Sequence, residues 1–258
     1  MANISRRTAI ERQIPASERL IIALDVDTPD EAWDFVESLG ESVSFYKVGL
    51  QLFLGPGMTI VEQLIGAGKK VFLDLKIDDT PRTVKEAVRR AAIDGVELFT
   101  LQGNRDTAIA ARDGRGRQRT PRFLQVTFLS SWDTSDLKAH FGIPESADIT
   151  LDQAVLNRTE TILGAGCEGV IASGQSVGEV RQRFGPDVLI VTPGIRPGDA
   201  SKDDHKRSLT PRDAIFAGSD YLVVGRPVRN AADPKHAAQA IIAEIETALV
   251  EKPTPAVA

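Results

Sequence analysis

Residues 70–92 read KVFLDLKIDDTPRTVKEAVRRAA and contain one complete strand-and-helix unit. Residues 70–76 are mostly apolar, as expected for a parallel strand that is covered on both faces. Thr80 can then cap a helix, Pro81 suits its first position, and Gly95 is expected to end it. The apolar side chains of this helix recur at three- and four-residue spacing and predict one buried stripe: Val84, Ala87, Val88, Ala91 and Ala92.

The same unit repeats along the chain, and eight apolar, β-branched runs predict eight strands. Polar side chains end nearly every run, and a barrel of this kind needs about 250 residues, so we expect a closed (β/α)8 TIM barrel. An open doubly wound sheet is the main alternative, but it would concentrate its functional residues at one crevice. The predicted strands cover residues 20–26, 44–50, 70–76, 96–103, 122–129, 169–174, 188–194 and 221–226.

The 258 residues divide into one expected domain and two flanking segments. The barrel is assigned to residues 19–250, with an N-terminal extension at 1–18 and a disordered tail at 251–258. The longest interval between strands is expected to hold an extra short helix at 135–141 before a helix at 151–163. In the last helix, Asp233 is the expected cap, Pro234 starts the helix, and five side chains face inward: Ala238, Ile241, Ile242, Ile245 and Ala248.

The composition is that of an ordinary soluble globular protein, with 42% hydrophobic and 26% charged residues. The formal net charge of −5 argues against a nucleic-acid or membrane-surface partner, since those binders usually carry a basic excess. No apolar run approaches the roughly 20 residues that span a bilayer, and residues 1–18 lack an apolar signal core. We therefore expect a cytoplasmic protein. Its one cysteine, Cys167, is interpreted as a small apolar core residue.

The end of the strand at residues 70–76 carries the chemistry that the sequence shows best. Asp74 and Lys76 are two residues apart, so they are expected to point to the same side, at the strand end where barrel active sites form. Asp79 follows in the turn before the helix. Two nearby carboxylates would keep the lysine protonated and make it a proton donor. The alternative interpretation is a structural salt bridge with a helix cap at Asp79.

A second candidate site follows the last two strands. Gly225 ends an apolar run, where a glycine lets backbone N–H groups approach an anion closely, and Arg226 adds a planar charged fork. Barrels often bind phosphate at this place. Residues 192–207 begin with Thr-Pro-Gly-Ile-Arg196 and continue as a long polar segment, which is typical of a lid over an active site. The alternatives are a turn glycine beside a surface arginine and a surface loop without a ligand.

These motifs together resemble the orotidine 5′-monophosphate decarboxylase family. Residues 74–83, Asp-Leu-Lys-Ile-Asp-Asp-Thr-Pro-Arg-Thr, are similar to its Asp-x-Lys-x-x-Asp signature, and five further motifs occur in the same order. They are Leu24-Asp25, Tyr46-Lys47-Val48-Gly49, Val126-Thr127, Thr192-Pro-Gly-Ile-Arg196-Pro and Val223-Val-Gly225-Arg226-Pro-Val. The sequence departs from the family at His205, where a glutamine is common, and at Asp78, where histidine or tyrosine is common. We expect His205 to replace the glutamine as a phosphate contact.

The resemblance implies a (β/α)8 barrel that converts orotidine 5′-monophosphate to UMP and CO2 in pyrimidine biosynthesis. It implies no cofactor and no metal, with Lys76, Asp74 and Asp79 as catalytic residues. It also implies a homodimer in which Asp79 and Thr83 cross into the partner's site. The implied substrate-binding residues are Asp25, Lys47, Asp74, Thr80, Thr83, Thr127, Arg196, His205, Gly225 and Arg226.

Three other functions remain open at this point. A related phosphosugar enzyme would share the Asp-x-Lys motif and use Mg2+. A Schiff-base aldolase would need Lys76 or Lys47 as a neutral amine, which flanking carboxylates disfavour. A non-catalytic nucleotide-binding protein of the same fold would bind UMP without turnover.

Overall fold

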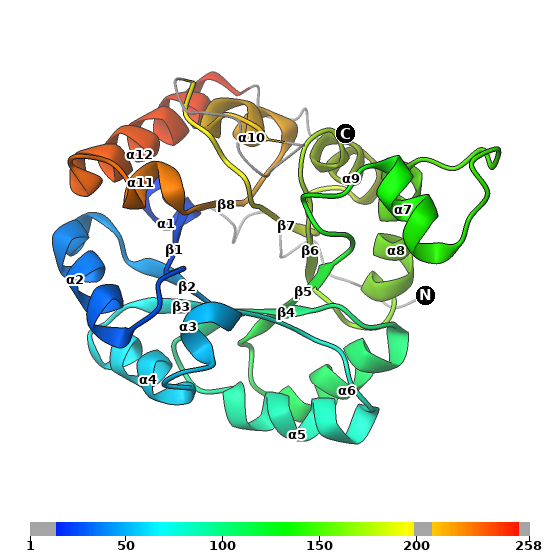
Figure 1. Ribbon diagram of the computed structural model, residues 1–258, viewed down its shortest axis with the longest axis horizontal. Helices are drawn as coiled ribbons and strands as arrows, with labels where there is room; N and C mark the ends of the chain where they lie inside the picture. Colours follow the sequence, from blue (N-terminus) through cyan, green and yellow to red (C-terminus); the bar gives the residue numbers. More distant parts are fainter. Residues whose placement is uncertain (1–13, 199–207, 253–258) are drawn as a thin grey trace.

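Eight parallel strands form a closed barrel in the computed structural model, which describes residues 14–198 and 208–252. Strand β1 pairs with both β2 and β8, so the sheet closes and the open-sheet alternative is wrong. The ring of strands and its surrounding helices are seen end-on in Figure 1. All eight predicted strands are confirmed, most with earlier ends: β1 Leu20–Ala23, β2 Phe45–Gly49, β3 Lys70–Ile77, β4 Val96–Leu101, β5 Arg122–Val126, β6 Gly169–Ile171, β7 Leu189–Thr192 and β8 Tyr221–Val224.

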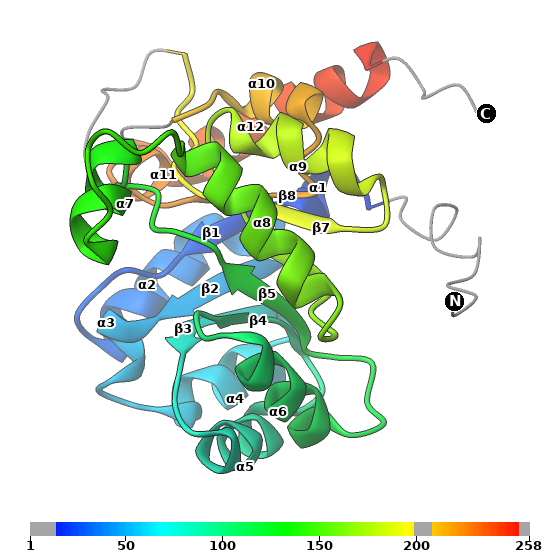
Figure 2. The ribbon, with the colours of Figure 1, turned by 90° about the vertical axis from the view of Figure 1, so that its right-hand side faces the viewer.

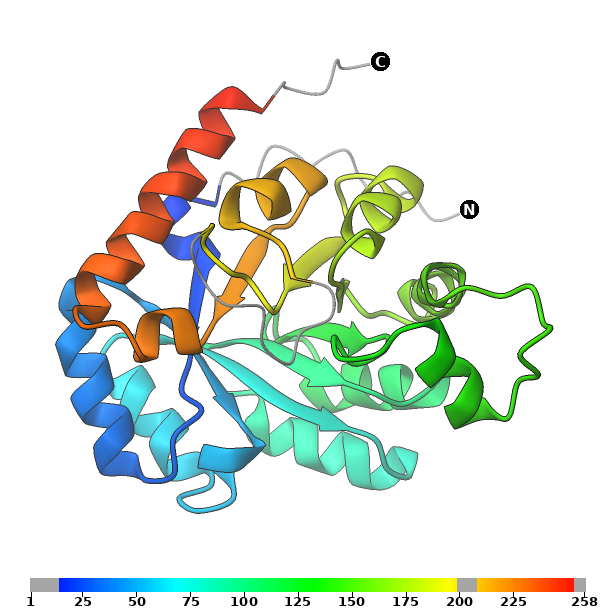
Figure 3. The same cartoon turned by 45° about the horizontal axis from the view of Figure 1, so that its top comes forward.

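Helices follow the strands and cover the outside of the barrel (Figure 2). The longer ones are α2 Pro29–Leu39, α4 Met58–Gly66, α5 Pro81–Ala91, α6 Arg105–Arg115, α7 Thr134–Phe141, α8 Leu151–Leu163, α9 Ser176–Phe184, α10 Pro211–Ala217 and α12 Pro234–Glu251. Shorter pieces are α1 Ala16–Arg19, η1 Gly40–Ser42, α3 Leu50–Phe53 and α11 Arg226–Arg229. The extra helix α7 and the loop after it project from the side of the barrel in Figure 3.

Helix α5 confirms its predicted start but not its predicted end. Pro81 occupies the first position, but the Thr80 hydroxyl lies 3.0 Å from the Thr83 hydroxyl and caps no backbone N–H. The helix ends at Ala91 rather than near Gly95, because the chain must turn earlier to enter β4. Gly95 lies in that turn with a φ of 96°, a conformation that glycine adopts at little cost.

Helix α12 follows its predicted pattern closely. The Asp233 side chain accepts a hydrogen bond from the His236 N–H, and Pro234 starts the helix. Four of the five predicted inward residues are buried, and Ile242 is only partly buried.

The core has two layers because each strand buries both of its faces. Side chains on the outer face pack against the helices in the larger cluster. The inner face fills the barrel with a smaller cluster drawn mainly from the strands: Ile21, Ala23, Phe45, Phe72, Leu98, Leu124, Leu189, Val191, Tyr221 and Val223. Successive inner residues of one strand are two apart. The next inner position of each strand therefore reaches the carboxyl end of the barrel.

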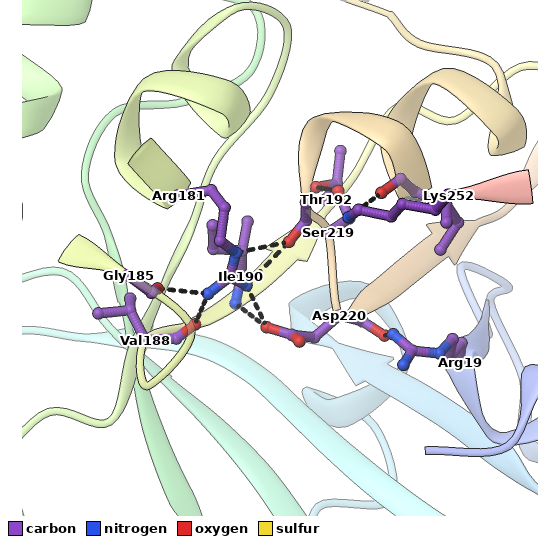
Figure 4. A network of polar contacts seen from close by, with 11 residues as sticks. Arg19, Arg181, Gly185, Val188, Ile190, Thr192, Ser219, Asp220 and Lys252 are labelled. Atoms are coloured by element: carbon purple, nitrogen blue, oxygen red, sulfur yellow. Dashed lines mark hydrogen bonds and ion pairs between the residues drawn. The ribbon is translucent and has the colours of Figure 1, made fainter. Parts of the chain in front are cut away.

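A polar network holds strands β7 and β8 to the surrounding helices at the opposite end of the barrel (Figure 4). The Arg181 guanidinium pairs with the Asp220 carboxylate at 2.8 Å and donates to the Gly218 carbonyl. The same carboxylate accepts the Ile190 N–H at 2.8 Å, and Arg19 donates to the Asp220 carbonyl at 3.0 Å. Each buried polar group here has a partner, which is what a stable closed sheet requires.

Three further observations concern residues away from the cavity. Cys167 is buried, and burial raises the pKa of its thiol to about 12, so it is an unreactive thiol at neutral pH. In residues 14–198 and 208–252, no helix is both long and apolar enough to span a bilayer. The same residues contain no cluster of three or more His, Cys, Asp and Glu side chains that could hold a metal ion.

Candidate active site

A cavity of about 490 Å³ opens at the carboxyl ends of the strands. This volume is in the usual range for small-molecule sites, about 300–1,000 Å³. Seven of its lining residues were predicted from the sequence: Asp25, Lys47, Asp74, Lys76, Arg196, Gly225 and Arg226. They come from β2 and β3 and from the segments that follow β1, β7 and β8, so the fold brings together residues up to 201 positions apart, from 25 to 226.

Four side chains on neighbouring strands form a row of alternating charge. The Lys47 ammonium lies 2.8 Å from the Asp25 carboxylate and 3.6 Å from Asp74. On its other side, Asp74 pairs with the Lys76 ammonium at 2.8 Å. Asp25, Lys47 and Asp74 each lie two residues beyond an inner core residue of the same strand, which is why they converge.

Ion pairs within this row hold Asp74 and Lys47 in their charged forms. Burial opposes charge on Asp74, but Lys47 and Lys76 outweigh it and hold the pKa of Asp74 below its usual range. Burial likewise opposes charge on Lys47, but Asp74 and Asp25 raise the pKa of Lys47 above its usual value. Asp74 and Lys47 are therefore both charged at neutral pH, and the Lys76 side chain that pairs with Asp74 lines the cavity.

Lys76 does not lie in a regular strand. Its φ is 51°, the only positive φ of a non-glycine residue in residues 14–198 and 208–252. The register between β3 and β4 also shifts between Leu73 and Ile77. A left-handed conformation in a lysine costs energy and persists only where its surroundings hold it, and such residues gather at functional sites.

Three arginines also line the cavity. Arg196 is buried, and its guanidinium donates to the Ile195 carbonyl at 3.0 Å. Arg226 follows Gly225 directly after β8 and also lines the cavity. Together with Arg229 they add three guanidinium groups to the cavity lining, and such groups suit an anion. His205 lies outside the described residues.

Several predicted site residues do not reach the cavity. Thr127 does not line it: its hydroxyl donates to the Ile171 carbonyl at 3.3 Å, and Val126 faces the cavity instead. Val126 lies two residues beyond Leu124, an inner residue of β5, so Val126 and not Thr127 continues the inner row of that strand. Thr80 and Thr83 are exposed on the outside and bind each other.

Asp79 and Asp78 also point elsewhere. The expected packing of Asp79 against Lys76 does not occur within one chain, because Asp79 is exposed and its carboxylate accepts the Thr80 N–H at 2.5 Å. Asp78, whose direction the sequence did not indicate, accepts a hydrogen bond from the Thr107 hydroxyl at 3.3 Å. It faces the first turn of α6 rather than the cavity.

The sequence analysis missed some residues that the fold places at the site. Phe128 and Ser130 follow β5 and line the cavity, as do Gln51 of α3 and Arg229 of α11. Arg229 donates to the Asp25 carbonyl and so links β1 to the segment after β8. The one sequence signal that could have identified these residues is their position soon after a strand. Many residues with a purely structural role occupy the same kind of position.

Comparison with known proteins agrees with this geometry. Residues 18–241 match the model of a protein family described as "Orotidine 5'-phosphate decarboxylase / HUMPS family". The orotidine 5'-phosphate decarboxylase of Methylobacterium sp. (strain 4-46) is 42% identical over 235 residues, which are 90% of this chain and 97% of that protein. The enzyme of the same name from Rhodopseudomonas palustris (strain BisB5) is 44% identical over 234 residues, covering 90% and 96% of the two chains.

Among solved structures, the orotidine 5'-phosphate decarboxylase of Lactobacillus acidophilus superimposes with a TM-score of 0.75 at 33% identity, covering 88% of this chain and 98% of that one. The enzyme of the same name from Pyrococcus horikoshii OT3 gives a TM-score of 0.68 at 27% identity, with 88% and 99% coverage. Sequence and structure thus agree over nearly the whole barrel: the chain belongs to the orotidine 5'-phosphate decarboxylase / HUMPS family.

Proposed function

We propose that this protein is a carboxy-lyase that converts orotidine 5′-monophosphate to UMP and CO2, with Lys76 as the proton donor. The observation that carries this proposal is one cavity lined both by an Asp–Lys–Asp–Lys row of ion pairs and by three arginines. A nucleotide presents the matching chemistry, a reactive base at one end and a phosphate at the other. The curated relatives, which carry the name of this enzyme, support the assignment.

The proposed step needs charge stabilisation rather than an electron sink. Loss of CO2 leaves an electron pair on C6 of the pyrimidine, and the C6–H bond forms with a proton from the Lys76 ammonium. The ammonium lies 2.8 Å from Asp74, so its direction is fixed before the reaction begins. Lys76 then becomes a neutral amine and regains its proton from solvent.

The rest of the cavity binds the parts of the substrate that do not react. The Asp25 carboxylate can accept a hydrogen bond from a ribose hydroxyl, and the Lys47 ammonium can donate one. Arg196, Arg226 and the backbone at Gly225 bind the phosphate. The phosphate lies far from the reacting carbon, and the energy of binding it can be used to orient the base over Lys76. Lys76 could not achieve this orientation alone.

The active unit is proposed to be a cytoplasmic homodimer. Asp79 and Thr83 are exposed on the segment that follows Lys76, where they are free to enter a neighbouring site. In that arrangement Asp79 of one subunit completes the charged row of the other. His205 is proposed as a further phosphate contact.

The test is a spectrophotometric assay of orotidylate loss with wild type, Lys76→Ala and Lys70→Ala. Lys70 is the matched control because it lies on the same strand, where it pairs with Glu18 at 2.7 Å. We expect Lys76→Ala to lose at least about 1,000-fold in kcat, since it removes both the acid and the charge. Lys70→Ala should retain activity. In D2O the product should carry deuterium at C6.

Other outcomes would identify the rival functions. Wild-type activity that disappears with EDTA would indicate a metal-dependent phosphosugar enzyme. Borohydride trapping of a carbonyl substrate on a lysine would indicate an aldolase. UMP binding without any orotidylate turnover would indicate a nucleotide-binding protein and would overturn the proposal.

A further inference from the structure

Thr100 of β4 contacts two members of the charged row with one hydroxyl group. Its Oγ1 accepts a hydrogen bond from the Lys76 N–H at 2.9 Å and donates one to Asp74 Oδ1 at 3.0 Å. That same Oδ1 accepts the Lys76 Nζ–H at 2.8 Å. Backbone, carboxylate and ammonium are thereby closed into one hydrogen-bonded loop through Thr100, which is completely buried.

The strand pairing explains why this hydroxyl is needed. Leu73 pairs with Phe99 and Ile77 pairs with Leu101. Three residues of β3, 74 to 76, therefore lie opposite a single residue of β4, residue 100. The extra residues of β3 interrupt the regular hydrogen-bonded ladder between β3 and β4. The Lys76 N–H therefore needs an acceptor other than a backbone carbonyl of that ladder.

The backbone conformation gives the second reason. Lys76 has a φ of 51°, which a lysine adopts only where neighbouring contacts hold it. Thr100 also continues the inner row of β4, two residues beyond the buried Leu98, so its side chain points into the barrel interior. Its position beneath the Lys76–Asp74 pair is thus set by the barrel interior.

We infer that Thr100 is a positioning residue for the reaction, whose hydroxyl holds the bulged Lys76 backbone and the Asp74 carboxylate so that the ammonium points at the reacting carbon. The inference rests on the proposed function for its effect on catalysis. Thr100 touches neither the substrate nor the transferred proton. It acts through the direction of the two groups that it binds.

The substitution Thr100→Val removes the hydroxyl and keeps the branched shape that suits a buried strand. We expect kcat to fall by about 10- to 100-fold, the range that follows from losing hydrogen bonds to a charged group. The dissociation constant for UMP, measured by calorimetry, should change by less than about threefold, because the phosphate and ribose contacts remain. Thr100→Ser should restore most of kcat.

Thr159→Val is the matched control, since Thr159 is equally buried and its hydroxyl donates to the Val155 carbonyl at 2.8 Å in α8. It should keep wild-type kcat. Equal kcat in the two valine variants would overturn the inference, as would a loss of UMP affinity in proportion to kcat. Failure of Thr100→Ser to restore kcat would overturn it too.

Hydrogen exchange at the Lys76 amide tests the inference without using activity. The amide should exchange slowly in wild type and Thr100→Ser, and faster in Thr100→Val, because its acceptor is lost. Unchanged exchange would overturn the inference even in an active enzyme. By contrast, an inactive wild type or an active Lys76→Ala would overturn the proposed function, whatever the exchange rates show.

Discussion

At the scale of single residues, Asp74 is the group on which the charged row depends. It is shared by Lys47 and Lys76, and without it two ammonium groups would lie close together with only Asp25 to balance them. Removing one partner of a buried ion pair is costly because the other charge remains buried. The carboxylate thus supports both the fold and the proposed proton donor.

The variant Asp74→Asn should be less stable than wild type by about 3 kcal/mol at pH 7. Since the pKa of Asp74 is lowered by folding, its contribution is present above the unfolded pKa, about 3.9, and is lost as pH falls through the folded pKa. The stability difference should therefore shrink below about pH 4. Urea unfolding across pH 3–7 measures it, with the exposed Asp94→Asn as the control. A difference that stayed constant would contradict the assignment.

At the scale of elements, helices α5 and α6 pack against each other unusually closely. Gly114 of α6 faces the Lys85 carbonyl of α5, and a Cβ added there would lie well inside van der Waals contact with this backbone oxygen. A carbonyl fixed in a helix cannot move aside as the end of a side chain can. Glycine at this position therefore sets how closely α5 approaches α6.

We expect Gly114→Ala to destabilise the protein by about 1–3 kcal/mol through overpacking between the two helices. Gly178→Ala is the matched comparison, because Gly178 lies within α9 and a Cβ there meets no atom within 4 Å. It should stabilise by about 0.5–1 kcal/mol, since alanine loses less backbone entropy in a helix. Thermal unfolding of both variants checks the pair. If both substitutions changed the stability equally, the helices would be relieving the close approach at Gly114 without any loss of stability.

At the scale of the whole molecule, we propose that the site takes residues from two chains. Within one chain Asp79 lies away from Lys76, although only three positions separate them in sequence. A second copy that supplies Asp79 would place another carboxylate beside the ammonium. Such reciprocal exchange is what a two-fold symmetric dimer produces.

Subunit complementation tests the shared site. Lys76→Ala and Asp79→Ala should each be nearly inactive alone. After mixing and subunit exchange, about a quarter of wild-type activity should return, because half of the dimers are mixed and each has one intact site. Mixing Lys76→Ala with the double variant Lys76→Ala/Asp79→Ala should restore nothing. If no activity returned from the first mixture despite exchange, Asp79 would act within its own chain.

Much of the fold could be predicted from local patterns. The apolar strand runs, the prolines that start α5 and α12, and the Asp233 cap are properties of neighbouring residues, so the sequence showed them directly. The site was harder. Phe123 and Leu124 are both fully buried on opposite faces of β5, so its apolar pattern did not reveal which face is inner. The pattern therefore could not test the assignment of Thr127, which rested on the resemblance, whereas the structure places Val126 at the cavity.

The sequence by itself determined the order of strands and helices and the residue types at the strand ends, because caps, turns and periodicity act over a few residues. The tertiary structure alone decided which of those side chains meet. Closure of β1 on β8, the surplus of β3 opposite Thr100 and the outward direction of Asp79 all depend on pairing between distant segments. No local pattern encodes that pairing, since it results from how the whole barrel packs.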